Sequence, residues 1–154
     1  MVIASAGVGA VVGAGVHEPM AALLRAAGAD PAGFQARALT ADLLRSSDLI
    51  LALTRRHRSA IVELLPGAVR RTFTLRELAR LSDMMDRGLL PATAPVTDRL
   101  RALVGLAAAQ RGRVPSTPAT DDVVDPYGGE LALYRRSFAE IEPAVDSLAR
   151  VLRG

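Results

Sequence analysis

The sequence predicts an α/β fold with a small parallel sheet. Short apolar runs of strand length alternate along the chain with segments whose apolar residues recur every three or four positions, as on one face of a helix. This alternation is typical of parallel sheets covered by helices. No internal repeat and no linker interrupts the 154 residues, so we expect one domain, residues 1–154.

The N-terminal part opens with an apolar run at residues 2–6, which we expect to be a buried strand. A glycine-rich stretch, residues 7–15, follows and leads to a helix predicted over residues 18–27. The larger apolar residues of that helix share one face, and Gly28 is a suitable stop.

The middle of the chain predicts a strand between two capped helices. Thr40 can cap a short helix that ends at residues 46–47. The continuous apolar run at residues 49–53 suits a strand covered on both faces. Thr54 can cap the next helix, which should continue to Pro66.

Another strand is predicted over residues 69–73, which are rich in β-forming side chains. Thr74 and Glu77 have the spacing of a capping box, so a helix should begin there. Thr97 is expected to cap a further helix that ends at Gly112.

The C-terminal part predicts a long loop followed by a long helix. Residues 113–129 are rich in Pro, Thr and Asp, as loops are. The last helix has one apolar stripe, and we expect it to be kinked or restarted at Pro143. The stripe consists of Tyr134, Phe138, Ile141, Val145, Leu148 and Leu152.

The composition is that of a globular protein, with half of the residues hydrophobic and a net charge of +3. All 19 basic residues are arginine, and they are scattered near acidic residues, so we expect no nucleic-acid partner. Residues 1–16 carry no charge, but they lack the basic start of a signal peptide and are too short to span a membrane. We therefore expect a soluble, cytoplasmic protein with no membrane partner.

The residue types that bind metals or cofactors form no convincing pattern. The chain has no cysteine, and His17 and His57 lack the paired spacing of a metal site. Gly7, Gly9 and Gly13 lie between a strand and a helix, as in a dinucleotide-binding turn. However, their spacing differs from G-x-G-x-x-G, and no strand ends in an acid at the required distance. We expect no metal and no cofactor.

Three aspartates gather in the predicted loop. We interpret Asp121 and Asp122 as solvated turn residues. Asp125 is followed by Pro126 and Tyr127, and a carboxylic acid held on a rigid loop at the edge of a cleft suits a general acid. On these grounds alone, an ordinary turn stays open as the alternative for Asp125.

Five stretches follow one another in a characteristic order from about residue 2 to the end of the chain. They are Ser5-Ala6-Gly7, Ala36-Arg37-Ala38-Leu39-Thr40, Ser47-Asp48-Leu49-Ile50-Leu51-Ala52-Leu53-Thr54-Arg55 with His57, Arg71-Thr72-Phe73-Thr74-Leu75-Arg76-Glu77-Leu78, and Asp125-Pro126-Tyr127-Gly128-Gly129. Together they resemble the low-molecular-weight protein tyrosine phosphatases. The resemblance implies a three-layer α/β sandwich with a small parallel sheet, and hydrolysis of phosphotyrosine.

The resemblance also implies roles for particular residues. In the family, the thiolate of an N-terminal Cys-x5-Arg loop attacks phosphorus, while Arg and backbone amides hold the phosphoryl oxygens. Asp125 matches the general acid that protonates the leaving phenolate and then activates water. Tyr127 matches an aromatic residue that flanks the cleft and recognises the substrate ring. The implied partner is a phosphotyrosine-containing protein.

The sequence departs from the family at its N-terminus. It starts where the family's second strand starts, so it contains neither the first strand nor the cysteine loop nor the first helix, and no other residue can act as the nucleophile. We expect a late start site or a fragment, which the codons upstream of Met1 would reveal. As written, the chain is expected to be inactive.

The missing strand would lie between residues 2–6 and residues 49–53, so each of these runs would lack a partner on one edge. We therefore expect a fold that is marginal, rearranged or completed by something else. The alternative function is a non-catalytic phosphatase-like module that binds another protein. Such a module could accept a strand from its partner or self-associate.

Overall fold

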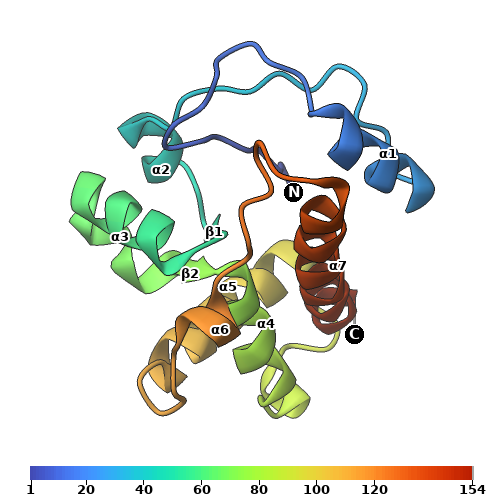
Figure 1. The fold of residues 1–154 in the computed structure, drawn as a ribbon. Coiled ribbons are helices and arrows are strands. Elements are labelled where there is room, and N and C mark those ends of the chain that lie inside the picture. Colours follow the sequence, from blue (N-terminus) through green and yellow to red (C-terminus); the bar gives the residue numbers. More distant parts are fainter. Residues whose placement is uncertain (154) are drawn as a thin grey trace.

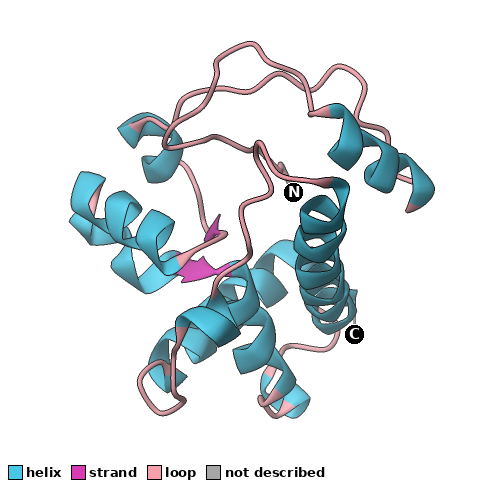
Figure 2. Cartoon of the chain, viewed as in Figure 1, coloured by secondary structure: helices cyan, strands magenta, loops and turns pink. Residues whose placement is uncertain are grey.

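The computed structural model describes residues 1–153, and most of them lie in helices and loops (Figure 2). The helices are α1 (Glu18–Ala26), α2 (Ala41–Arg45), α3 (Arg55–Leu64), α4 (Leu75–Asp83), α5 (Val96–Gln110), α6 (Pro118–Asp121) and α7 (Leu131–Arg153), and the strands are β1 (Ile50–Ala52) and β2 (Thr72–Thr74) (Figure 1). Two short 3-10 helices, η1 (Pro66–Arg71) and η2 (Arg87–Leu89), complete the elements.

The sheet is small and parallel, as the sequence predicts. β1 pairs with β2 in a register that places Leu51 opposite Phe73. Ile50 and Ala52 point to one face, where they pack with α2 and α3 around Leu44 and Ile61. Phe73 points to the other face and joins the larger core formed by α4, α5 and α7. The three-layer arrangement of helices, sheet and helices is therefore confirmed.

The larger core brings the second half of the chain together. Its fully buried side chains come from β2, α4 and α5, and α7 covers them with Leu148 and Val151. The core is built mainly from Leu and Ala, together with Phe73 and Met85. Since these residues are close-packed and apolar, this half should supply most of the hydrophobic stabilisation.

The strand predicted for residues 2–6 does not form. Gly7 and Ala38 make an isolated parallel bridge, in which the Gly7 N–H donates to the Arg37 carbonyl at 2.9 Å and the Leu39 N–H donates to the Gly7 carbonyl at 3.0 Å. Within residues 1–153, residues 2–6 themselves make no backbone–backbone hydrogen bonds. A strand needs a ladder along at least one edge, and here the one bridge lies at Gly7, just after the predicted run.

The predicted helix caps on Thr40, Thr54 and Thr74 are confirmed, because each threonine hydroxyl accepts a backbone N–H three residues later. Thr74 and Glu77 form the complete capping box. These caps are local in sequence, so the pattern of residues alone identifies them.

Three boundaries differ from the prediction. Residues 66–71 form η1, and the strand begins only at Thr72, whose hydroxyl donates to the Ala68 carbonyl at 2.8 Å. Helix α5 begins one residue before Thr97, because the Pro95 carbonyl accepts the first helical bonds. Helix α7 runs through Pro143 without restarting. Pro143 is exposed, so the carbonyl that lacks a donor can be hydrated.

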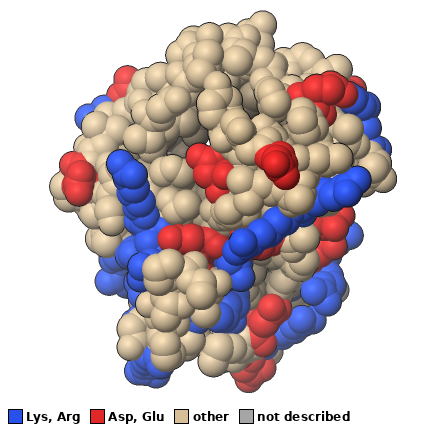
Figure 3. Space-filling view, in the orientation of Figure 1, with Lys and Arg blue, Asp and Glu red and all other residues tan. Residues whose placement is uncertain are grey.

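Within residues 1–153, no helix is both long and apolar enough to cross a membrane. Charged side chains of both signs alternate over the lower part of the face shown in Figure 3, while uncharged side chains cover most of its upper part.

Candidate active site around the Asp125 loop

The loop that carries Asp125 lies at the carboxyl end of β1. The Val123 N–H donates to the carbonyl of Leu53, the residue after β1 ends at Ala52, at 2.8 Å, and the Val123 side chain is buried. One residue further, the Val124 N–H donates to a carboxylate oxygen of Glu140 on α7, at 2.9 Å. The segment that leads to Asp125, which we call the acid loop, is thus attached both to the end of β1 and to α7. Ligand sites of parallel α/β proteins form at this end of the strands.

Asp125 itself is exposed and forms a tight local turn. Its carboxylate accepts the Tyr127 N–H at 3.0 Å, which is its one hydrogen bond within the described residues. Gly129 follows in a position where a Cβ would come within 2.7 Å of a Leu133 methyl and 3.1 Å of the Pro126 carbonyl. Gly128 has a φ of +73°, a region that favours glycine. The two glycines therefore let the chain turn sharply from Asp125 into α7.

Tyr127 contacts a small aromatic cluster at the start of α1. Its ring is largely exposed and meets His17 edge-on, with 6.5 Å between ring centroids. His17 also stacks on Tyr134 at 5.5 Å, and the Tyr134 hydroxyl lies 2.9 Å from His17 Nδ1. Tyr134 is buried, so it provides a fixed support for His17 and, through it, for Tyr127. No pattern in the sequence indicates this contact, because His17 and Tyr134 are 117 residues apart.

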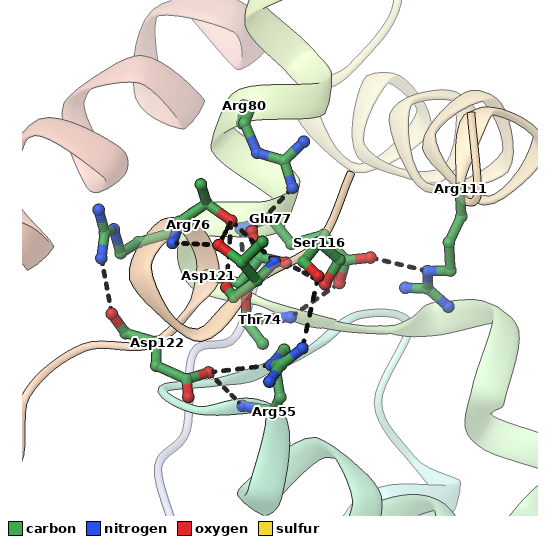
Figure 4. A network of polar contacts seen from close by, with 11 residues as sticks. Arg55, Thr74, Arg76, Glu77, Arg80, Arg111, Ser116, Asp121 and Asp122 are labelled. Atoms are coloured by element: carbon green, nitrogen blue, oxygen red, sulfur yellow. Dashed lines mark hydrogen bonds and ion pairs between the residues drawn. The ribbon is translucent and has the colours of Figure 1, made fainter. Parts of the chain in front are cut away.

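The interpretation of Asp121 and Asp122 as solvated turn residues is wrong. Asp121 is 1 % exposed, pairs with Arg80 at 2.7 Å and accepts the Ser116 hydroxyl (Figure 4). Burial alone would raise the pKa of Asp121, but the hydrogen bonds from Ser116 and Arg80, with the Arg80 charge, outweigh it and hold the pKa below its ordinary value. Asp121 therefore attaches α6 to α4.

Asp122 attaches the same loop to α3. Its carboxylate accepts the Arg55 N–H at the first turn of α3 at 2.7 Å, where a negative charge is favourable (Figure 4). Its backbone carbonyl accepts Arg76 at 2.6 Å. The predicted cap-adjacent position of His57 is confirmed: its N–H donates to Thr54 in that same turn.

Glu140 is a further site residue that the sequence did not reveal. Burial would raise its pKa, but the Val124 N–H and the hydrogen bond from Arg136 lower it below the ordinary value. Glu140 is therefore ionised at neutral pH and holds the backbone just before Asp125. No sequence signal marks it, since an Arg and a Glu four residues apart on a helix are common.

Glu77, by contrast, stabilises β2 through an ion pair with Arg111. It accepts Arg111 at 3.0 Å, and the same guanidinium donates to the Thr72 carbonyl at 2.6 Å and lies 4.0 Å from the centre of the Phe73 ring. Burial lowers the pKa of Arg111, partly offset by the Glu77 charge. Within residues 1–153, no group of His, Asp or Glu side chains is arranged to hold a metal ion.

These features define an α/β protein that presents an anchored acidic loop at the carboxyl end of a parallel strand. A family model described as low molecular weight phosphotyrosine protein phosphatase matches residues 1–90, more than half of the chain. The chain belongs to this family.

Two solved structures have a similar fold. A tyrosine phosphatase of Erwinia amylovora, amsI, is 18 % identical with a TM-score of 0.62, over 94 % of this chain and 70 % of that chain. The YwlE arginine phosphatase of Geobacillus stearothermophilus is 24 % identical with a TM-score of 0.65, over 96 % of this chain and 71 % of that chain. No curated protein sequence matches the chain.

Proposed function

We propose that the chain carries the general-acid loop of a phosphotyrosine protein phosphatase active site, with Asp125 as the general acid. The observation that carries the proposal is the loop anchored by Leu53 and Glu140, which presents Asp125 at the carboxyl end of β1. Membership of the phosphatase family supports it. The resemblance of the Asp125-Pro126-Tyr127 motif supplies the role.

The chemistry assigns Asp125 two proton transfers. In the first step a thiolate attacks phosphorus, the bond to the phenolic oxygen breaks, and Asp125 gives its proton to that oxygen. In the second step a water oxygen attacks phosphorus, Asp125 takes the proton, and the sulfur–phosphorus bond breaks to release phosphate. The thiolate comes from outside residues 1–154, because these contain no cysteine. A reduced thiol fits a cytoplasmic location.

Tyr127 is the residue we propose for contact with the substrate ring. Its side chain is 77 % exposed beside Asp125, and its orientation is set from behind by His17. An exposed aromatic face at the edge of a site can stack on, or meet edge-on, the phenyl ring of a phosphotyrosine side chain.

The alternative is a non-catalytic phosphatase-like module that binds a protein. The lack of any cysteine favours it, since Asp125 alone cannot form a phosphoenzyme. Both functions predict that the chain by itself does not hydrolyse p-nitrophenyl phosphate, so a different experiment is needed to separate them.

The separating experiment extends the chain at its N-terminus with a segment that carries an apolar strand and a Cys-x5-Arg loop. The proposal expects the extended protein to hydrolyse p-nitrophenyl phosphate and phosphotyrosine peptides. Asp125→Ala should lower kcat by about 10²- to 10⁴-fold. Asp146→Ala, which removes another exposed aspartate, serves as the control and should have no effect. An Asp125→Ala variant with full activity would contradict the proposed role.

The same assay tests the substrate class. Because one similar structure is an arginine phosphatase, a phosphoarginine peptide is compared with a phosphotyrosine peptide. We expect the higher kcat/KM for phosphotyrosine, and the reverse order would reassign the substrate.

A further inference from the structure

The short helix η1 is surrounded by arginines from three elements. It packs between α3 and α5, and its own last two residues are arginines. Arg58 of α3 and Arg111 at the end of α5 meet on one backbone atom. Nε of Arg58 donates to the Thr72 carbonyl at 3.2 Å, and Arg111 donates to the same oxygen at 2.6 Å. We call this region the η1 surface, and it consists of Arg58, Leu64, Val69, Arg70, Arg71 and Arg111.

The positive charge of the η1 surface is largely uncompensated. Arg111 pairs with Glu77, which is buried. Within residues 1–153, Arg58, Arg70 and Arg71 form no ion pair. Burial lowers the pKa of Arg111, the Glu77 charge partly offsets this, and the nearby Arg58 charge lowers it further. A negatively charged group bound beside Arg58 would therefore relieve repulsion between two cations.

Arg58 presents two guanidinium nitrogens to solvent. Its Nε is held by the Thr72 carbonyl, while its terminal nitrogens are not buried and make no hydrogen bond within the described residues. Glu63, the one carboxylate of α3, forms no ion pair with it. The two terminal nitrogens of a guanidinium match the two oxygens of a carboxylate. Because Arg58 is already anchored, it loses less freedom when it binds such a group.

Exposed apolar side chains lie among these arginines. Val69 is 40 % exposed, and its carbonyl accepts a hydrogen bond from Arg111 at 2.8 Å. Leu64 is 50 % exposed and ends α3 two residues before η1 begins. Phe73, which lies under Arg111, is fully buried and offers no face on which a nucleic-acid base could stack. Cationic and apolar side chains together favour a protein partner over a nucleic acid.

We propose that the η1 surface binds an acidic segment of a partner protein. The carboxylates of this segment pair with Arg58 and Arg70, and its apolar side chains pack on Val69 and Leu64. The occupant thus complements both features of the surface, its unpaired charge and its exposed apolar area.

The segment binds through its side chains and does not extend the sheet. The Thr72 carbonyl of β2 is occupied by two arginines, and the Thr74 N–H donates to Glu77. The backbone of β2 is therefore already covered where a further strand would pair. The η1 surface lies beside the first residue of β2, whereas the acid loop lies at the carboxyl end of the parallel strand β1. The inference is therefore independent of the proposed function.

The test uses the full chain and a synthetic peptide of about 12 residues composed of Glu and Leu. Two matched probes accompany it, the same peptide with Gln in place of Glu and an oligothymidylate of similar length. Calorimetry should give a Kd below about 100 μM for the Glu peptide and values at least about tenfold higher for the other two. Equal binding of the Gln peptide, or tighter binding of the oligothymidylate, would overturn the inference.

Variants of α3 locate the binding. Arg58→Gln should weaken it by about tenfold or more, and Arg58→Lys, which keeps the charge but not the fork, by about threefold. Arg56→Gln is the matched control. It removes the same charge from an exposed position two residues away, on another face of the helix, and should change the Kd by less than about twofold.

A further variant keeps the test decisive if Arg58→Gln does not fold. Arg70 is exposed and makes no hydrogen bond or ion pair within the described residues, so Arg70→Gln should fold and still weaken binding by about threefold or more. Equal losses in the Arg56 and Arg58 variants would show unspecific attraction and contradict the inference. Self-association of the free chain that Arg58→Gln abolishes would also contradict it, because a second copy would then be the occupant.

Discussion

The first 40 residues and the segment from β2 to α4 are both rich in apolar residues, but they differ in how much of them is buried. Residues 1–40 are rich in Val, Ala and Gly, yet Ala21 is their one buried residue and Gly7 their one point of strand pairing to Ala38. Between Thr72 and Asp83, most side chains are buried, and a capping box and two buried ion pairs fix their positions.

An apolar composition is therefore not sufficient to bury a segment. Val2 and Ile3 are as hydrophobic as the core residues, but they are 95 % and 83 % exposed because no element lies beside them. Phe73 is fully buried because β1, α4 and α5 surround it. A strand contributes to stability through its neighbours, and the N-terminal run is followed by a single bridge at Gly7 but has no strand partner of its own.

The largest expected effect comes from truncating the well-packed region. Leu78→Ala should lower the free energy of unfolding by about 2–5 kcal/mol, because Leu78 is fully buried in the main core. Ile3→Ala should change it by less than about 0.5 kcal/mol. Urea denaturation of both variants measures the contrast, and similar losses in the two would contradict it.

A smaller effect is expected at the ion pair that attaches the acid loop to α4. Asp121→Asn should destabilise the protein by about 2–3 kcal/mol, since it leaves the partly buried Arg80 without its counter-charge. The pKa of Asp121 is lowered in the folded protein, so the pair stabilises the fold above the ordinary carboxyl pKa of about 4. This contribution is lost as the pH falls through the folded pKa.

Stability measured between pH 3 and pH 7 checks the sign of this effect. The difference between wild type and Asp121→Asn should shrink as the pH falls below about 4. A difference that grows toward acid pH would show that the ionised carboxylate does not stabilise the fold.

The glycine that follows Asp125-Pro126-Tyr127 provides the next comparison. Gly129→Ala should lower the free energy of unfolding by about 1–2 kcal/mol, because its Cβ would displace a Leu133 methyl and lie tightly, at 3.1 Å, against the Pro126 carbonyl. Gly9→Ala is the matched control in the N-terminal region, where a Cβ meets nothing within 4 Å. Thermal unfolding of the two variants decides whether the two regions differ in packing as described.

The smallest effect is expected at Glu140. Glu140→Leu, which removes the acceptor, should lower stability by about 1 kcal/mol and speed amide exchange at Val124. Glu142→Leu, at an exposed position two residues along the same helix, is the control and should leave that exchange unchanged. Unchanged exchange at Val124 in the Glu140 variant would show that the loop is held by other contacts.

The sequence predicted those parts of the fold that depend on neighbours along the chain. The caps at Thr40, Thr54 and Thr74 and the strand at β1 follow from local patterns and are confirmed. The resemblance to the phosphatase family is also confirmed. The prediction of a strand at residues 2–6 is wrong, because strand pairing depends on a partner that local sequence patterns do not reveal.

The candidate site was predicted only in part for the same reason. Asp125 and Tyr127 stand out as a motif, and their catalytic roles stay predictions. The contacts that position them come from α1, α7 and the end of β1, which are distant in sequence. Asp121 was misjudged because a buried ion pair with Arg80 has no signature in the sequence of the loop.

Native-state hydrogen exchange of the free chain tests the division between the two regions most directly. We predict strong protection in α4, α5 and α7, and exchange at residues 1–6 close to that of an unfolded chain. Protection of residues 1–6 at the level of α4 would contradict this prediction, because those residues would then have strand partners that the described fold does not provide.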